Sequence, residues 1–191
     1  MGAIAPSSRK VAERIAKWAR ISRAHRVIEL GAGTGSITGE LLSHLPEPSR
    51  LLAIERHPRF AAELAQRFPR TRVVSDCASR IRAIASEEGF TDADAVVSTL
   101  PWSQFSNGLQ RRLLTDIRGI LSGSGVFVAA VCFGPHWMAG GQSFRHHLEE
   151  TFGRVSVTPI SFSNFPPLFI YVAERVGLPR VISPTWIKSA G

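Results

Sequence analysis

The sequence has few cysteines, no long apolar run and fewer acidic than basic residues. Its two cysteines, Cys77 and Cys132, lie within predicted core segments and stand in no metal-ligand spacing, which predicts reduced structural thiols in a cytosolic protein. The longest apolar run, 126–133, is much shorter than the roughly 20 residues that cross a bilayer. Any contact with a membrane is therefore expected to be peripheral.

Basic residues outnumber acidic ones by 23 to 15, which gives a net charge of +8 at pH 7. This balance favours a polyanionic partner, but composition alone does not separate nucleic acid from an anionic membrane surface. The 191 residues are enough for one domain with a substantial core, but too few for a catalytic domain and a full recognition domain.

Three glycines at alternate positions mark the most informative stretch, 27–37, where an apolar run ends in Glu29 and leads to Gly31, Gly33 and Gly35. A helical pattern follows at once, so the stretch predicts a strand, a tight turn and a helix. Glycine permits positive φ and lets a ligand approach the main chain closely. The free N–H groups at the start of the helix can hold a carboxylate or a phosphate.

Acidic residues also mark the ends of the next two predicted strands. Glu55 lies 20 residues beyond Gly35, where nucleoside-binding folds place the carboxylate that accepts hydrogen bonds from the ribose. Asp76 follows the third strand, and the fourth leads into Thr99-Leu100-Pro101-Trp102. Because the carboxyl ends of parallel strands meet at one edge of a sheet, we expect this last stretch to form the floor of a reaction site.

Alternating strand and helix patterns, closed by two strands, predict a doubly wound α/β fold. The expected strands are 26–30, 51–55, 71–75, 94–98, 126–132, 155–162 and 168–174, and the expected helices are 9–22, 35–45, 58–68, 109–121 and 142–152. The segment 133–141 is expected to be a flexible, aromatic lid, and 177–191 a poorly ordered tail.

The first predicted helix, 9–22, places Val11, Ile15 and Trp18 on one face and most of its basic residues elsewhere. This pattern suits a membrane surface, and it suits packing of the apolar face on the core equally well. The pair His146-His147 lies in a later helix, where adjacent side chains point in different directions. We therefore expect these histidines to be solvated, and we expect no metal site.

The segment Glu29-Leu30-Gly31-Ala32-Gly33-Thr34-Gly35 resembles motif I of the class I S-adenosyl-L-methionine (SAM) dependent methyltransferases. The resemblance implies a Rossmann-like, seven-stranded, mostly parallel sheet with an antiparallel last strand and helices on both faces. It implies that Glu29 and the loop hold the amino acid end of SAM, Glu55 the ribose and Asp76 the adenine amine. The implied cofactor-binding residues are Ser8, Glu29, Gly31, Ala32, Gly33, Thr34, Gly35, Glu55, Arg56, Asp76, Cys77, Ala78, Ser98 and Leu100.

Four further stretches resemble a narrower group, the bacterial phospholipid N-methyltransferases, which convert phosphatidylethanolamine stepwise to phosphatidylcholine. They are Gly2-Ala3-Ile4-Ala5-Pro6-Ser7-Ser8, Val97-Ser98-Thr99-Leu100-Pro101, Phe133-Gly134-Pro135 and Asn164-Phe165-Pro166-Pro167-Leu168. The resemblance implies a monomer at the inner face of the cell membrane, with anionic phospholipid as its surface. It divides the chain into a basic amphipathic helix with its cap (1–24), a methyltransferase domain (25–176) and a tail (177–191).

The main alternative is an rRNA adenine N6-dimethylase, a family whose motif I and layout look similar. That family carries Asn-Leu-Pro-Tyr/Phe where this chain has Thr99-Leu100-Pro101-Trp102, and threonine cannot reproduce the two-sided hydrogen bonding of asparagine. Trp102 is still able to stack on a base. A third hypothesis is a SAM-binding protein without catalysis, or a small-molecule methyltransferase.

Under the lipid hypothesis, a neutral amine attacks the methyl group of SAM in line and S-adenosyl-L-homocysteine is the product. The attack requires a base or a route for the proton to water. Trp102 and Tyr171 are the candidates for an aromatic wall that tolerates a cationic, methylated amine. Tyr171 suits a core position in a strand equally well. His136 is the candidate base.

Overall fold

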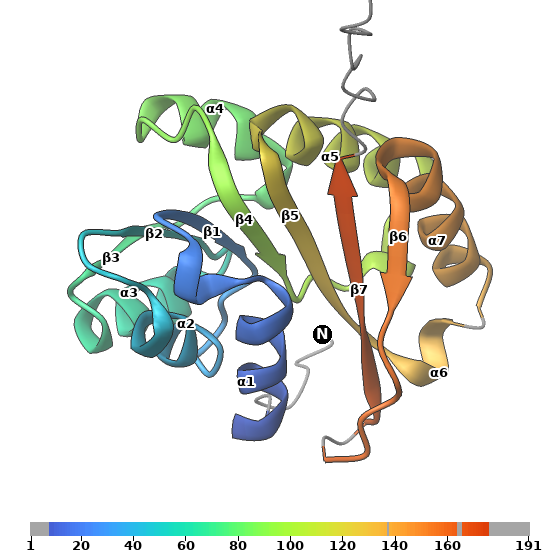
Figure 1. Cartoon of the computed structure of the whole chain (residues 1–191), viewed down its shortest axis with the longest axis horizontal. Helices are drawn as coiled ribbons and strands as arrows, with labels where there is room; N and C mark the ends of the chain where they lie inside the picture. The colour runs from blue at the N-terminus through green and yellow to red at the C-terminus, as the bar shows by residue number, and fades with distance from the viewer. Residues whose placement is uncertain (1–7, 137, 164–165, 176–191) are drawn as a thin grey trace, which may run out of the picture.

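A single seven-stranded sheet organises the protein (Figure 1). The computed structural model describes residues 8–136, 138–163 and 166–175. The strands are β1 (Arg26–Leu30), β2 (Arg50–Ile54), β3 (Thr71–Val74), β4 (Ala93–Ser98), β5 (Leu121–Cys132), β6 (Gly153–Val157) and β7 (Leu168–Arg175). Their order is β3-β2-β1-β4-β5-β7-β6, and β7 is antiparallel to both neighbours. The predicted mostly parallel sheet with an antiparallel last strand is confirmed.

Helices and short 3₁₀ turns connect these strands. The helices are α1 (Arg9–Trp18), α2 (Thr38–His44), α3 (Pro58–Arg67), α4 (Ile81–Glu87), α5 (Asn107–Ile120), α6 (Phe133–His136) and α7 (Ala139–Phe152). The 3₁₀ turns are η1 (Ile21–Arg23), η2 (Ala78–Arg80) and η3 (Trp102–Gln104). None of the helices in the described part of the chain is long and apolar enough to span a membrane.

The core has two main parts, one on each face of the sheet. Successive side chains of a strand point to opposite faces, so Val27 packs in a cluster with α1 and α2. Its neighbour Ile28 packs in a cluster with α4, α5 and α7. The inner strands are therefore buried on both faces, as is typical of parallel strands covered by helices.

Helix α1 is shorter than the predicted helix 9–22. It ends at Trp18 because Arg20 adopts a left-handed backbone conformation with a φ of 54°. For a residue other than glycine this conformation costs about 1 to 2 kcal/mol. Val11 and Ile15 are fully buried on the sheet, which confirms the core-packing interpretation for these two residues. Trp18 follows on the same face of the helix as predicted, but it is not buried with them, since 42% of its surface is exposed.

The segment 133–141, expected to be a flexible, aromatic lid, contains α6 before residue 137 and the start of α7 after it. The N–H of Phe133 donates to the carbonyl of Pro167 at 2.8 Å, which fastens the start of α6 beside the start of β7. Four predicted features lie outside the described residues: Gly2 to Ser7 of the opening stretch, residue 137, the pair Asn164-Phe165, and the tail 177–191. The lid function stays a prediction.

Candidate functional site

Most of the predicted cofactor-binding residues follow strands that end at one edge of the sheet, which we call the carboxyl edge. Leu30, at the end of β1, is in register with Ile54 of β2 and Ser98 of β4, and Ile54 with Val74 of β3. The segments that follow these four strands are therefore neighbours. They are the glycine loop 31–35, the turn at Glu55, the turn at Asp76 and the loop 99–105.

The glycine loop needs glycine for two different reasons. Gly31, Gly33 and Gly35 have φ values of 77°, 54° and 84°, which other residues rarely adopt. A Cβ on Gly35 would lie 2.5 Å from the Phe68 ring, and one on Gly31 would lie 3.1 Å from Leu100. A Cβ on Gly33 would meet no atom within 4 Å. The middle glycine thus faces open space, where a ligand can approach the main chain.

Glu29 is a buried carboxylate that is only half satisfied. Its Oε2 accepts a hydrogen bond from the Thr38 hydroxyl at 2.7 Å, whereas its Oε1 has no partner among the described residues. The pKa of Glu29 is raised to about 7. Burial is the largest cause, the hydrogen bond from Thr38 opposes the rise, and the nearby Glu55 carboxylate adds to it. A buried carboxylate oxygen without a donor is suited to a cationic group such as an ammonium.

Glu55 lies across the same loop. Its Oε2 accepts from the N–H of Gly33 at 2.9 Å, and its Oε1 accepts from the N–H of His57 at 2.8 Å. Each carboxylate oxygen has a further lone pair, so the group can still accept hydrogen bonds from two hydroxyls. The structure thus brings Glu29, Gly33 and Glu55 together, whereas Arg56 beside them is exposed.

Asp76 lies at the next strand end, where its side chain is partly buried. One oxygen accepts from the N–H of Cys77 at 2.6 Å, and the other pairs with Arg80. Cys77 is exposed and not in the core as expected, and Ala78 begins η2. Ser8 is the N-cap residue of α1. The adenine and cofactor roles of these residues stay predictions.

The loop 99–105 is fastened to the glycine loop. The hydroxyl of Thr99 donates to the carbonyl of Gly31 at 2.7 Å, and the side chain of Leu100 packs over Gly31. Ser98 is fully buried, and its hydroxyl accepts from the Trp102 indole N–H at 3.0 Å. This loop therefore holds a fixed position at the carboxyl edge, and its role as the floor of a site stays a prediction.

The two aromatic candidates occupy the core. Trp102 and Tyr171 are each only 1% exposed. The ring of Trp102 stacks on Phe144 with centroids 4.5 Å apart, and Tyr171 packs edge-on against the same ring. Burial of this kind gives no surface for an acceptor, so it corrects the expectation of an aromatic wall and favours the core alternative for Tyr171. His136 ends α6, and its side chain lies outside the described part of the structure.

A buried polar network that was not predicted from the sequence lies behind the loop 99–105. The Gln110 amide is fully buried and donates to the carbonyls of Trp102 at 2.8 Å and Gly140 at 3.0 Å. Its oxygen accepts from Nδ1 of His147 at 3.0 Å. His147 is buried, so the expectation that both histidines are solvated is wrong for this one. Burial, followed by the charge of Arg111, lowers the pKa of His147, which favours the neutral ring.

This network connects the site floor to two helices. Gly140 packs so closely on the loop that a Cβ there would lie 2.1 Å from the carbonyl oxygen of Ser103. Helical spacing could have revealed Gln110, because it precedes Leu113, Leu114 and Ile117 on the buried face of α5. Among the described residues, no group of three or more histidine, cysteine or acidic side chains is arranged to hold a metal ion.

No protein-family model matches the chain. The ornithine lipid N-methyltransferase of Singulisphaera acidiphila is 34% identical to it over 130 residues, which are 66% of this chain and 68% of that protein. The probable ribosomal RNA small subunit methyltransferase A of Haloarcula marismortui is 35% identical over 115 residues, which are 59% of this chain but only 38% of that protein.

Among solved structures, the O-methyltransferase TomG from Streptomyces achromogenes in complex with SAM is similar in fold. Its TM-score is 0.71 at 20% identity, and the match covers 88% of this chain and 81% of that one. At this identity the likeness shows the fold alone.

Proposed function

Because the chain belongs to the class I SAM-dependent methyltransferases, we propose that it methylates the amine of phosphatidylethanolamine, and of the mono- and dimethyl products, towards phosphatidylcholine. The cofactor is S-adenosyl-L-methionine, and S-adenosyl-L-homocysteine is the product. The observation that carries the lipid substrate is the 34% identity to a lipid N-methyltransferase over two thirds of that protein. The choice of phosphatidylethanolamine rests on the resemblance of stretches such as Phe133-Gly134-Pro135 to the phospholipid enzymes.

The residues at the carboxyl edge fit the cofactor. Glu29 offers a buried oxygen without a partner to the ammonium of SAM, and the open space at Gly33 admits a ligand to the main chain. We assign the ribose hydroxyls to Glu55 and the adenine amine to Asp76, whose carboxylates lie at the ends of β2 and β3. The bound cofactor supplies an electrophilic methyl group on a sulfonium. The chain supplies the orientation, through the fixed loops 31–35 and 99–105.

Exposed apolar side chains at the carboxyl edge support a lipid acceptor. Met138 is 64% exposed and Phe162 is 78% exposed, the largest values among the large apolar residues described. Met138 comes shortly after α6, which begins directly after β5. Phe162 follows Ser161, and Ser161 pairs with Leu168, which in turn pairs with Cys132 at the end of β5. Exposed apolar side chains beside a site are suited to the interface of a bilayer. We propose that the protein acts as a monomer at the cytoplasmic face of the cell membrane.

The amine must be neutral to attack, so a group has to take its proton. We keep His136 as the proposed base, because α6 begins directly after β5 at the carboxyl edge. Holding the amine in a fixed orientation at the loop 99–105 and excluding water would supply the rest of the rate acceleration of methyl transfer.

A second candidate function is methylation of rRNA adenine, which the 35% identity to a probable ribosomal RNA methyltransferase favours. Two contacts speak against it. The Trp102 ring is buried and stacked on Phe144, so it offers no face to a flipped base. The hydroxyl of Thr99 donates its hydrogen bond to the carbonyl of Gly31, so it is not directed at an acceptor amine.

The test is transfer of radiolabelled methyl groups from SAM to mixed vesicles that contain phosphatidylethanolamine, with the lipid products separated by headgroup. The proposal predicts label in mono-, di- or trimethylated phosphatidylethanolamine. Vesicles with phosphatidylcholine in its place control for label that does not depend on a free amine. Small-subunit rRNA is offered as acceptor in a parallel assay, and label in the RNA with none in the lipid would instead establish the RNA enzyme.

The substitution Glu55→Ala is expected to weaken SAM binding by roughly tenfold or more without unfolding the domain, because each hydrogen bond to a carboxylate contributes about 1.5 to 3 kcal/mol. Isothermal titration calorimetry with SAM measures the affinity, and thermal melting checks the fold. Glu63→Ala is the matched control, because Glu63 is an exposed acid on the nearby helix α3. An affinity equal to that of the wild type would remove the ribose assignment from Glu55.

A further inference from the structure

The hydrogen bond between Thr38 and Glu29 closes the glycine loop at its base. Glu29 is the last residue but one of β1, and Thr38 is the first residue of α2. Side chains alternate between the two faces of a sheet, so Glu29 shares the face of Val27, which packs in a cluster with α1 and α2. From the start of α2, the Thr38 hydroxyl donates to Oε2 of Glu29 at 2.7 Å. This bond thus joins the strand before the loop to the helix after it.

Neither helix capping nor core packing accounts for a hydroxyl at Thr38. The N-cap residue of α2 is Ile37, and this helix start has no side-chain cap. Thr38 is fully buried, where valine would have the same branched shape without a polar group. A buried hydroxyl costs free energy unless it is hydrogen-bonded, and here the bond goes to Glu29. The hydroxyl is therefore accounted for by its contact with this carboxylate.

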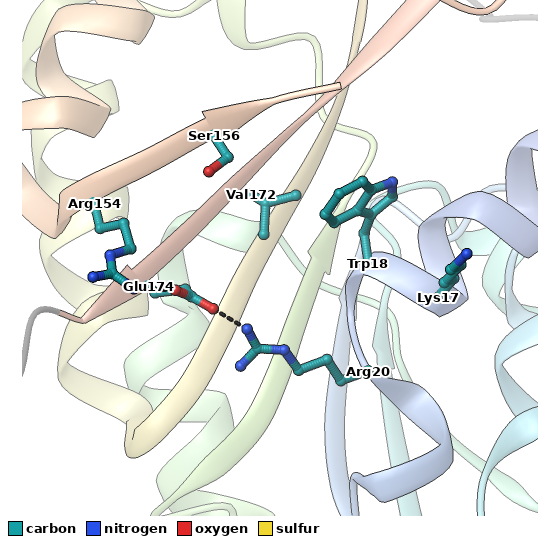
Figure 2. Close-up of a pocket in the computed structure, with 7 residues that line it drawn as sticks. All are labelled: Lys17, Trp18, Arg20, Arg154, Ser156, Val172 and Glu174. Carbon is teal, nitrogen blue, oxygen red and sulfur yellow. Dashed lines mark hydrogen bonds and ion pairs between the residues drawn. The ribbon is translucent and has the colours of Figure 1, made fainter. Parts of the chain in front are cut away.

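The carboxylate of Glu174 shows how such a group is satisfied elsewhere in this chain. It lines a hollow of about 410 Å³ between α1 and the strands β6 and β7 (Figure 2). Arg20 pairs with one of its oxygens, along the dashed line in the figure, and Arg154 lies 3.7 Å from the other. Both oxygens therefore have a cationic partner. Glu29, in contrast, has a hydroxyl on Oε2 and no partner for Oε1 in the part of the chain that the structure describes.

The single hydrogen bond from Thr38 has two consequences for Glu29. It occupies Oε2, and so it leaves Oε1 as the oxygen that can accept a hydrogen bond from a ligand. It also stabilises the ionised carboxylate, and this lowers the pKa of Glu29 against the effect of burial. A carboxyl without this bond would be free to rotate, and it would hold its proton up to a higher pH.

Glu55 is the charged group that faces Glu29. The register partners of Glu29 in the neighbouring strands, Ala53 and Val97, are uncharged, and the face of α1 that is buried in the same cluster is apolar. The like charge of Glu55 raises the pKa of Glu29, as burial does. The hydrogen bond from Thr38 is thus the contact that opposes both effects.

We propose that Thr38 is a positioning residue for the cofactor, whose hydroxyl holds the Glu29 carboxylate in the orientation that directs Oε1 at the ammonium of SAM. Thr38 itself touches no part of the cofactor and acts through Glu29. Fixing the carboxylate before the ligand arrives reduces the ordering that binding requires. The proposal rests on the cofactor of the proposed function, and it goes beyond that function by naming the residue that orients Glu29. It does not depend on which acceptor is methylated.

The test is calorimetric titration of Thr38→Val with SAM on both sides of the Glu29 pKa of about 7. The pH below which binding weakens should move upwards by about one unit or more, since a hydrogen bond to a charged group contributes at least the equivalent of one pKa unit. Near pH 7 the affinity should fall roughly tenfold, and the loss should shrink as the pH rises. The ammonium of SAM titrates equally in every variant, so the shift between variants reports the protein.

Two further variants separate positioning from folding. Thr38→Ser restores the hydroxyl and should return the affinity and the pH dependence close to those of the wild type. Thr71→Val is the matched control, because Thr71 is a buried threonine of β3 whose hydroxyl has no partner among the described residues. This control should leave the pH dependence of SAM binding unchanged. Should Thr38→Val fail to fold, Thr38→Ala gives the same comparison with Thr38→Ser.

A purely structural role for Thr38 predicts a lower melting temperature with an unchanged pH dependence of SAM binding, and this result would overturn the proposal. An equal shift in Thr71→Val, or a loss that Thr38→Ser does not restore, would overturn it too. If the wild type does not bind SAM, the cofactor assignment fails together with the proposal. A wild type that binds SAM with the expected shift but methylates no lipid contradicts the proposed acceptor and supports the role of Thr38.

Discussion

Replacing Glu29 with glutamine is expected to stabilise the ligand-free protein above neutral pH and to weaken its binding of SAM. The pKa of Glu29 rises from 4.5 to about 7 in the folded state, chiefly because the carboxyl is buried. A raised folded-state pKa means that the stability is complete below the unfolded value of 4.5 and is lost as the pH rises through about 7. Between about pH 5 and pH 8 the wild type should lose about 2 to 3 kcal/mol through this group alone.

The glutamine variant does not titrate there, so its stability relative to the wild type should increase by this amount between the two pH values. Urea unfolding at both values measures the difference, and Glu63→Gln, an exposed acid on α3, is the control that should show no such trend. A difference in unfolding free energy between the variant and the wild type that is independent of pH would contradict a raised pKa of the buried Glu29 carboxyl.

The same substitution should reduce the affinity for SAM by roughly tenfold to hundredfold, because it removes a charged partner worth about 1.5 to 3 kcal/mol. In the wild type, the ammonium of SAM requires the ionised carboxylate, so the affinity should fall as the pH decreases through about 7. In Glu29→Gln the affinity should be nearly independent of pH over this range. Calorimetric titration across the range tests both statements. Equal pH dependence in the two proteins would show that another group titrates.

The substitution Gly140→Ala is expected to destabilise the protein by about 3 kcal/mol or more, at the upper end of overpacking effects. The added Cβ would lie 2.1 Å from the backbone oxygen of Ser103, where no side chain can rotate away. Helix α7 would have to move away from the loop 99–105. This movement would also weaken the hydrogen bond from the Gln110 amide to the Gly140 carbonyl. We expect a lower methyl-transfer rate at saturating SAM, because the floor of the site moves with this loop.

Gly119→Ala is a matched control within helix α5. A Cβ at Gly119 would meet no atom within 4 Å, so alanine should stabilise the helix by about 0.5 to 1 kcal/mol. Urea unfolding and methyl-transfer rates of both variants measure these effects. Equal stability of the two variants would show that the contact between α7 and the loop is looser than described.

The arrangement of the sheet was predictable because its signals are local. Apolar runs that end in an acid placed β1 at 26–30, and the structure confirms these bounds. The glycine spacing predicted the tight loop, and all three glycines have positive φ. The positions of Glu29 and Glu55 at the ends of two successive strands also predicted that they lie together, since neighbouring parallel strands end at the same edge of a sheet.

The remaining features of the fold and the site depend on packing that a linear pattern does not express. Trp102 follows a strand end, where an aromatic residue can face either a ligand or the core, and only the arrangement of α7 decides for the core. Arg20 carries no sign of its left-handed backbone, because such positions are usually marked by glycine or asparagine. Gln110 and His147 were detectable by helical spacing, but their polarity suggested exposed faces.

The most direct test of the proposed lipid N-methylation is a competition among acceptors, with phosphatidylethanolamine vesicles, ornithine lipid vesicles and small-subunit rRNA offered together with radiolabelled SAM. The kcat/KM for each acceptor follows from the label that it takes up. We expect the highest kcat/KM for phosphatidylethanolamine, a lower one for ornithine lipid and no label in RNA. Preferential labelling of ornithine lipid would contradict the proposed headgroup, and preferential labelling of RNA would contradict the lipid function itself.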